Sequence, residues 1–207
     1  MVKELGVGDP APDFELPTDG GGHARLSDLK GKAVALYFYP KDDTSGCTAE
    51  AIAFNTLRAK FAATGAVVIG VSPDNVASHD KFKRKHSLQF PLAADPERSA
   101  INLYGVWKEK SMYGRKYFGV ERSTFLVGRE GRIAKVWRKV KVPGHAEAVL
   151  AAAKALGPLQ ALARGPGFAG TLSSRRAAYQ AHSVFHGAQS KPAGSARRPS
   201  RSLFAIR

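Results

Sequence analysis

The chain contains a single cysteine, Cys47, and the residues around it give that cysteine a defined chemical setting. It ends the stretch Pro40-Lys-Asp-Asp-Thr-Ser-Gly-Cys47, after an apolar run and at the start of a pattern typical of a helix. The first N–H groups of a helix have no partner within the helix, and the helix dipole is positive at that end. Both effects favour a thiolate, which reacts with peroxides far better than a thiol does. The position of Cys47 therefore predicts a reactive thiolate.

Thr44 and Pro40, which precede the cysteine in this stretch, fit the same chemistry. Thr44 is expected to place a hydroxyl near the sulfur, where it can donate to a thiolate and accept from a hydroperoxide. Pro40 closes one side of the loop and has no backbone N–H. The alternative is that Cys47 is a small buried core residue, as most free cysteines are. Its polar neighbours, and its place on a strand-to-helix turn at the carboxyl edge of a sheet, favour the reactive interpretation.

The elements that position Cys47 follow from the apolar pattern. The run from Ala33 to Tyr39, bounded by Gly31 and Pro40, predicts a strand buried on both faces. From Cys47 to Ala63, apolar residues recur at steps of three and four, which predicts a helix. Similar patterns predict strands over 66–72 and 90–95, helices over 78–86, 98–103 and 146–156, and hairpins over 13–26 and 123–137. Together they predict an α/β fold in three layers, with a central mixed sheet and helices on both faces.

The charge divides the 207-residue chain into two parts. Lys and Arg number 32 and Asp and Glu 17, for a net charge of +15. Residues 1–157 carry 24 of the basic and all 17 of the acidic side chains, whereas residues 158–207 carry 8 basic and no acidic ones. The second part is built mainly from Ala, Ser, Gly, Pro and Arg, which cannot bury enough apolar surface to offset the entropy of ordering. We expect a domain over 1–157 and a disordered basic tail over 158–207.

The tail leaves several interpretations open. Its arginine pairs at 175–176 and 197–198, with aromatic residues between them, could bind nucleic acid or an anionic surface. In that case the domain would be a passive or redox-sensing platform. No recognition motif accompanies the pairs, so nucleic acid is not expected as a partner, and the tail is the one part of the chain that could bind it. The tail could also be an extension without selected function, or the product of a frameshift. The basic run Lys81–His86 within the domain predicts a solvated helix face, or a docking site for an acidic reductase.

Composition also excludes several classes of site. One cysteine cannot form an intramolecular disulfide or a multi-cysteine zinc or iron–sulfur site. No apolar run approaches the roughly 18 residues of a membrane span, and no signal peptide is evident, so a cytoplasmic protein is expected. His182 and His186 have a spacing found in helical metal sites, but no third ligand accompanies them. We therefore expect neither a metal nor an organic cofactor.

Residues 1–157 resemble the peroxiredoxins of the bacterioferritin comigratory protein, or Q, subfamily. The spacing Pro40-x-x-x-Thr44-x-x-Cys47 matches the active-site motif of that family. Further similar stretches are Gly8-Asp-Pro-Ala-Pro-Asp-Phe-Glu-Leu-Pro, Val67-Val-Ile-Gly-Val-Ser, Tyr104-Gly-Val-Trp, Met112-Tyr-Gly-Arg, Arg122-Ser-Thr-Phe-Leu-Val and Val136-Trp-Arg-Lys-Val-Lys-Val-Pro-Gly-His. The resemblance implies a thioredoxin-like fold and a thiol-dependent peroxidase that reduces hydrogen peroxide and organic hydroperoxides. It also implies a monomer or weak dimer.

The resemblance assigns roles to individual residues. Cys47 matches the peroxidatic nucleophile, Thr44 the hydroxyl that orients the peroxide, and Pro40 the residue that shields the sulfur from water. Arg122 matches the arginine that stabilises the thiolate and the transition state, and Glu50 the acidic residue that holds this arginine. Read without the resemblance, Arg122 would be a surface salt bridge or a solvated charge.

The sequence departs from the family at the position of the second, resolving cysteine. Many members carry it five residues after the first, where this chain has Ile52, and some carry it on a later helix, where this chain also has none. Ser45 stands where proline is common. A sulfenic acid on Cys47 therefore cannot condense with an internal thiol. We expect a one-cysteine cycle that is completed by an external thiol such as thioredoxin, glutaredoxin or glutathione.

Overall fold

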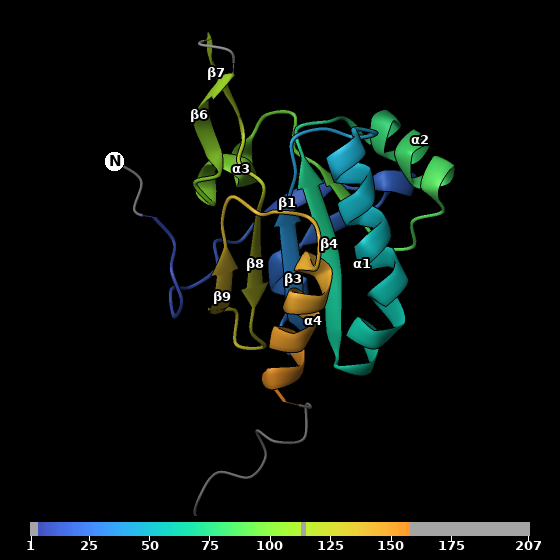
Figure 1. The fold of residues 1–207 in the computed structure, drawn as a ribbon. Helices are drawn as coiled ribbons and strands as arrows, with labels where there is room; N and C mark the ends of the chain where they lie inside the picture. The colour runs from blue at the N-terminus through green and yellow to red at the C-terminus, as the bar shows by residue number, and fades with distance from the viewer. Residues whose placement is uncertain (1–3, 113–114, 158–207) are drawn as a thin grey trace, which may run out of the picture. The chain divides into compact units, whose positions relative to one another are not determined.

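The computed structural model describes residues 4–112 and 115–157 of the chain (Figure 1). Its centre is a five-stranded sheet in the order β5-β4-β3-β8-β9. β3, β4 and β5 are parallel, β8 runs antiparallel to β3, and β9 runs antiparallel to β8. These strands span Ala33–Phe38 (β3), Ala66–Ser72 (β4), Leu92–Ala94 (β5), Ser123–Val127 (β8) and Ile133–Trp137 (β9). The predicted mixed sheet is confirmed, and every residue of β3 is buried, as its continuous apolar run predicts.

Two apolar clusters lie on opposite faces of the sheet and define the layers. The first packs the sheet against α1 (Ser45–Ala63), α2 (Val76–His86) and α4 (His145–Ala155). α1 and α4 lie over the same face of the sheet in Figure 1. The second cluster packs the sheet against α3 (Ser99–Leu103) and the N-terminal hairpin of β1 (Glu15–Pro17) and β2 (His23–Arg25). The predicted α/β architecture, a thioredoxin-like three-layer fold with helices on both faces, is therefore confirmed.

The boundaries of several elements differ slightly from the expected ones. α1 begins at Ser45, two residues before the predicted start at Cys47, because Thr44 has the extended backbone of an N-cap residue. α2 begins at Val76, where the side chain of Asn75 accepts a hydrogen bond from the N–H of Ser78. Two short 3-10 helices, Asp19–Gly21 and Leu26–Leu29, flank β2 and were not predicted.

One hairpin was not predicted at all. β6 (Trp107–Met112) and β7 (Arg115–Val120) pair with each other in a separate two-stranded sheet, which lies at the upper edge of Figure 1. Their sequences alternate charged and apolar residues irregularly, so no buried face is visible in the pattern. β8 follows the hairpin almost directly, so the hairpin determines the position of the short connection between β7 and β8.

Some expectations lie outside the described residues. The predicted disordered tail over 158–207 and the pair His182 and His186 are among them. Among residues 4–112 and 115–157, no helix has the length and apolar character needed to cross a membrane.

Candidate active site

Cys47 lies in the first turn of α1, just beyond the carboxyl end of β3. A short loop, residues 39–44, connects the strand to the helix, and the carbonyl of Thr44 accepts the first helical hydrogen bond, from the N–H of Thr48 (2.8 Å). The cysteine side chain is 1% exposed. A sulfur in this position lies at the positive end of the helix dipole, and burial keeps water away from the sulfur.

Arg122 reaches the sulfur from the start of β8, the strand next to β3 in the sheet. Because β8 is antiparallel to β3 and pairs Ser123 with Phe38, the residue before β8 lies beside the residue after β3. Nη2 of Arg122 donates a hydrogen bond to Sγ of Cys47 at 3.2 Å. The guanidinium also passes close to Gly46, where a Cβ would lie 3.3 Å from Nη2. The structure thus brings together two predicted residues that are 75 positions apart.

Glu50 holds the other end of the guanidinium. Nη1 of Arg122 donates to a carboxylate oxygen of Glu50, whose side chain is 1% exposed. Burial raises the pKa of Glu50 to about 7, although the positive charge of Arg122 acts in the opposite direction. Burial alone would lower the pKa of Arg122, but the charges of Glu50 and Cys47 raise it overall. Arg122 therefore stays a cation and is shared between two acidic groups.

The other two predicted site residues lie in the loop. Pro40 is partly buried at the end of β3, and Thr44 is the exposed N-cap of α1. The hydroxyl of Thr44 donates to the carbonyl of Lys41 (3.2 Å), which leaves the lone pairs of its oxygen available to accept another hydrogen bond. Arg122 thus contacts both Cys47 and Glu50 directly, and Thr44 and Pro40 lie in the loop that leads to Cys47.

Three further titratable groups face this cluster and were not predicted. Lys110 on β6 donates to the carbonyl of Val120, and burial lowers its pKa, with Arg122 acting in the same direction. Tyr37 on β3 is buried with an unpaired hydroxyl, and burial, followed by the charges of Glu50 and Cys47, raises its pKa. Burial, with Arg122 nearby, lowers the pKa of His145 to about 4, so this ring is neutral at pH 7. No sequence motif marks them, because each reaches the cluster only through the tertiary fold.

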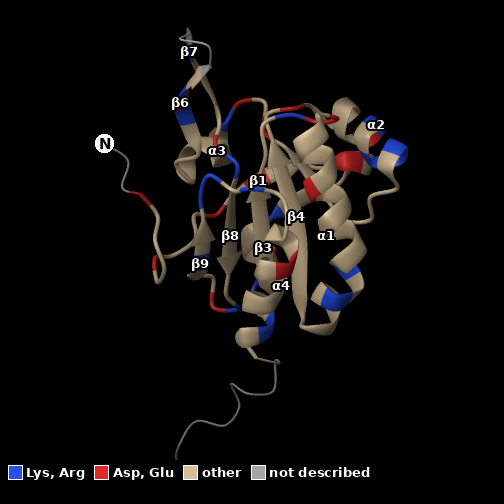
Figure 2. Cartoon of the chain, in the orientation of Figure 1, with Lys and Arg blue, Asp and Glu red and all other residues tan. Residues whose placement is uncertain are grey.

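The basic run on α2 is partly engaged within the domain. In Figure 2, the Lys and Arg positions of this helix are coloured blue. Lys83 pairs with Asp19, and Lys85 and His86 both pair with Asp43 in the loop before α1. These three side chains therefore make intramolecular contacts, while the other basic residues of the run are exposed, in agreement with the predicted solvated face.

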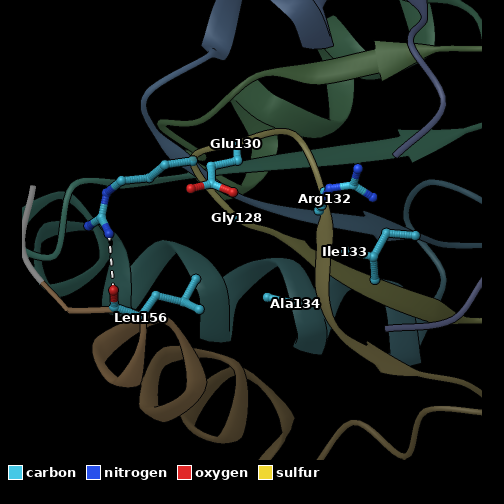
Figure 3. A pocket seen from close by; sticks show the side chains of 7 residues that line it. Gly128, Glu130, Arg132, Ile133, Ala134 and Leu156 are labelled. Carbon is cyan, nitrogen blue, oxygen red and sulfur yellow. Dashed lines mark hydrogen bonds between the residues drawn. The ribbon is translucent and has the colours of Figure 1, made fainter. Parts of the chain in front are cut away.

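A separate pocket lies away from the cysteine. It has a volume of about 260 Å³ and is formed by the turn between β8 and β9 and the end of α4 (Figure 3). Arg129 donates there to the carbonyl of Leu156 (3.1 Å). None of the predicted site residues lines it. Within the described ranges, no group of three or more His, Cys, Asp or Glu residues is arranged to hold a metal ion.

Comparison with known proteins places this site in a family. The sequence profile of the AhpC/TSA family matches residues 7–136. Peroxiredoxin Bcp of Bacillus subtilis is 52% identical over 139 residues, covering 67% of this chain and 88% of the relative. The putative peroxiredoxin bcp of Coxiella burnetii is 50% identical over 144 residues, covering 70% of this chain and 95% of the relative.

A solved structure of peroxiredoxin Q from Xanthomonas campestris is 46% identical, with a TM-score of 0.68, and the match covers 73% of this chain and 96% of that protein. Other structures of the Xanthomonas protein concern its alkyl peroxide reduction activity, and two carry serine in place of one or the other of two cysteines. The chain therefore belongs to the AhpC/TSA family and, within it, to the peroxiredoxins of the Bcp or Q type, which are thiol peroxidases.

Proposed function

We propose that this peroxiredoxin reduces hydrogen peroxide and organic hydroperoxides by a one-cysteine cycle, with Cys47 as the nucleophile and an external thiol as the reductant. The observation that carries the proposal is the contact of Arg122 with Sγ of Cys47 (3.2 Å) in the first turn of α1. A cation and the end of a helix dipole at one sulfur both favour the thiolate. The chain has no other cysteine.

In the oxidation step, the thiolate of Cys47 attacks the terminal oxygen of the hydroperoxide. An S–O bond forms, the O–O bond breaks, and the sulfur is oxidised by two electrons while the peroxide is reduced. The leaving alkoxide or hydroxide takes up a proton and departs as alcohol or water, and Cys47 remains as the sulfenic acid. Arg122 can donate to the peroxide oxygens as negative charge moves onto the leaving group.

The remaining residues support this step. Glu50 keeps the guanidinium of Arg122 in a fixed orientation through their hydrogen bond. The oxygen of Thr44 accepts the peroxide O–H, since its own proton is directed to Lys41. Pro40, partly buried at the end of β3, limits access of water to the sulfur.

In the reduction step, an external thiol attacks the sulfenic acid and releases water, which leaves a mixed disulfide on Cys47. A second thiol then attacks this disulfide and frees the thiolate of Cys47. Thioredoxin, glutaredoxin and glutathione are the reductants of the right chemistry. Ile52, at the position where the resemblance implies a second cysteine in many members of the family, is 44% exposed and has no group that could replace an internal thiol.

The reduction of alkyl peroxides by the Xanthomonas relative supports organic hydroperoxides as substrates. Such an activity would serve antioxidant defence and cell redox homeostasis. A cytoplasmic location and a monomeric or weakly dimeric state stay predictions from the sequence and its resemblance.

The proposal is tested by hydrogen peroxide consumption with dithiothreitol as reductant. Cys47→Ser is expected to abolish turnover, whereas Ile52→Ser, a change on the exposed face of the same helix, is expected to leave it unchanged. Turnover with thioredoxin, glutaredoxin and glutathione systems, measured side by side, identifies the physiological class of reductant. Peroxide consumption that survives Cys47→Ser would refute the proposed role of this cysteine.

A further inference from the structure

A buried carboxylate in the loop before α1 has no part in the chemistry described above. Asp42 is 7% exposed, and its two oxygens accept three hydrogen bonds. Oδ1 accepts from the hydroxyl of Tyr39 (2.8 Å), and Oδ2 accepts from the hydroxyl of Ser78 (2.7 Å) and from Nδ1 of His79 (2.9 Å). Ser78 and His79 belong to the first turn of α2, so this carboxylate joins the loop to that helix.

The backbone of the loop is held as well. The N–H of Asp42 donates to Oδ2 of Asp74 (2.8 Å), and the same oxygen accepts from the hydroxyl of Ser72 at the end of β4 (2.8 Å). Residue 42 is therefore fixed by its side chain to α2 and by its backbone to the β4–α2 connection.

The next residue provides a second connection to the same helix. Asp43 has φ of 57°, a left-handed conformation that turns the chain sharply toward α1. Its carboxylate oxygens contact Nζ of Lys85 (2.6 Å) and Nε2 of His86 (3.0 Å), in the last turn of α2. Two consecutive aspartates thus attach the loop to both ends of one helix.

The strength of the two connections differs because their burial differs. His79 is fully buried, and burial alone would raise the pKa of Asp42, but the hydrogen bonds from His79, Ser78 and Tyr39 outweigh burial and lower it. The side chain of Asp43 is 46% exposed, so its ion pairs are screened by water. Asp42 is therefore the stronger anchor of the loop.

We propose that Asp42, held by His79 and Ser78, is a positioning residue of this peroxidase, which fixes the loop of Thr44 and Cys47 in the conformation that reacts with peroxide and keeps Cys47 closed to larger thiols. The inference deepens the proposed function and rests on it. Thr44 and Cys47 follow Asp42 by two and five residues, so any shift of the loop moves both groups.

The same anchor is expected to speed the oxidation of Cys47 and to slow its reduction by an external thiol. Attack on peroxide requires the sulfur, Arg122 and Thr44 in a fixed geometry, and small displacements of such groups are costly in rate. Reduction requires a thiol to reach a sulfur that is 1% exposed, which requires the loop and the first turn of α1 to move. Weakening the anchor is therefore expected to slow oxidation and to speed attack by an external thiol.

The test compares Asp42→Asn with Asp95→Asn in the full-length protein. Asn keeps the shape at position 42 but directs an NH₂ group at one of the donors that now meet a carboxylate. Asp95 is a control that is also buried: it is 0% exposed, and its carboxylate accepts from the N–H groups of Ser99 and Ile101 at the start of α3 and from the hydroxyl of Ser99. His79→Phe, which removes the ring donor but keeps the carboxylate, is the second test variant.

Three rates are measured: alkylation of Cys47 by iodoacetamide, oxidation by one equivalent of hydrogen peroxide, and formation of the mixed disulfide with glutathione after oxidation. For Asp42→Asn and His79→Phe we expect oxidation to slow by about 10-fold or more, on the scale known for misplaced reacting groups. We expect alkylation and mixed-disulfide formation to become several-fold faster, because the free energy of opening the loop locally is lower. Asp95→Asn is expected to leave all three rates near those of the unsubstituted protein.

Unchanged rates in both Asp42→Asn and His79→Phe, or a parallel slowing of all three rates, would overturn the inference. Equal effects from Asp95→Asn would overturn it too, because they would reflect a general loss of stability. The alkylation rate does not depend on peroxidase activity. Faster alkylation in an enzyme whose Cys47 is not oxidised by peroxide would therefore overturn the proposed function and the reactive half of the inference, while identifying the anchor as the closing contact.

Discussion

At the scale of single residues, the site depends on one guanidinium shared by two acidic groups. Arg122 donates to Cys47 and to Glu50 at once, and both contacts are shielded from water by burial. A planar, five-donor cation can satisfy two acceptors in fixed directions, which a lysine ammonium cannot do with the same geometry.

This geometry predicts the effect of replacing Arg122. Arg122→Lys is expected to lower kcat/KM for hydrogen peroxide by about 10²-fold or more, the range seen when a transition-state donor is removed. Arg138→Lys, at an arginine that pairs with Glu4 instead, is the matched control and is expected to have little effect. Steady-state kinetics with saturating reductant measure both, and equal activity of Arg122→Lys and the unsubstituted enzyme would contradict the role given to the guanidinium.

The raised pKa of Glu50 predicts how the free energy of unfolding depends on pH. Its pKa is raised from 4.5 to about 7 in the folded protein, so the folded state holds this proton more tightly than the unfolded state does. The stabilisation by the protonated form is fully present below about pH 4.5 and is lost as the pH rises through about 7, on the order of 3 kcal/mol in all. Urea denaturation of the unsubstituted protein and of Glu50→Gln, from pH 4 to pH 8, measures this difference. Parallel stability profiles for the two proteins would show that Glu50 has no raised pKa.

At the scale of elements, one arginine ties two helix ends together. Arg129, 9% exposed, donates to the carbonyl of Thr64 after α1 and to those of Leu156 and Gly157 after α4. Thr64 and Leu156 are the C-cap residues of the two helices, whose carbonyls have no partner within the helix, and the cation also lies at the negative ends of both dipoles.

Arg129→Ala is therefore expected to reduce the free energy of unfolding by about 2–3 kcal/mol without changing kcat/KM. Arg132→Ala, at an exposed arginine on the same turn that donates to the carbonyl of Gly8, is the control and is expected to cost much less. Chemical denaturation monitored by tryptophan fluorescence provides the comparison. A similar loss in both variants would mean that the helix ends are not what Arg129 stabilises.

The elements also show what can be predicted from the sequence and what cannot. β3 and β4 were predictable because strands buried on both faces have continuous apolar runs. The β6–β7 hairpin was not, because its pairing is supported by backbone hydrogen bonds and exposed pairs such as Lys116 with Glu109 (3.1 Å) rather than by an apolar face.

The site was predictable only in part for a similar reason. The setting of Cys47 is local, since the strand, loop and helix start lie within a few residues. The contact with Arg122 depends on the antiparallel pairing of Ser123 with Phe38, and the anchor of Asp42 depends on where α2 packs. Residue types and spacing do not encode these distances directly, and only the resemblance to a family pointed to Arg122 and Glu50.

At the scale of the whole molecule, just over half of the net charge of +15 lies in residues 158–207, outside the part of the chain that holds the proposed site. The residues proposed to act in catalysis lie between positions 40 and 122, whereas residues 158–207 hold 8 basic side chains and no acidic one. A chain ending at Gly157 is therefore expected to keep kcat/KM within about 2-fold of the full-length value, because none of the proposed groups is removed. A large loss of activity on truncation would show that the last 50 residues contribute to the site.

The central claim is that Cys47 alone carries the cycle and that an outside thiol completes it. Intact-protein mass spectrometry can follow both steps, after one equivalent of hydrogen peroxide and then one equivalent of glutathione, which leaves no second thiol to release the mixed disulfide. We expect one added oxygen on the protein after peroxide, then a single glutathione in mixed disulfide with Cys47, and neither product in Cys47→Ser. A protein that gains no oxygen and no glutathione, or a Cys47→Ser variant that forms the same products, would contradict it.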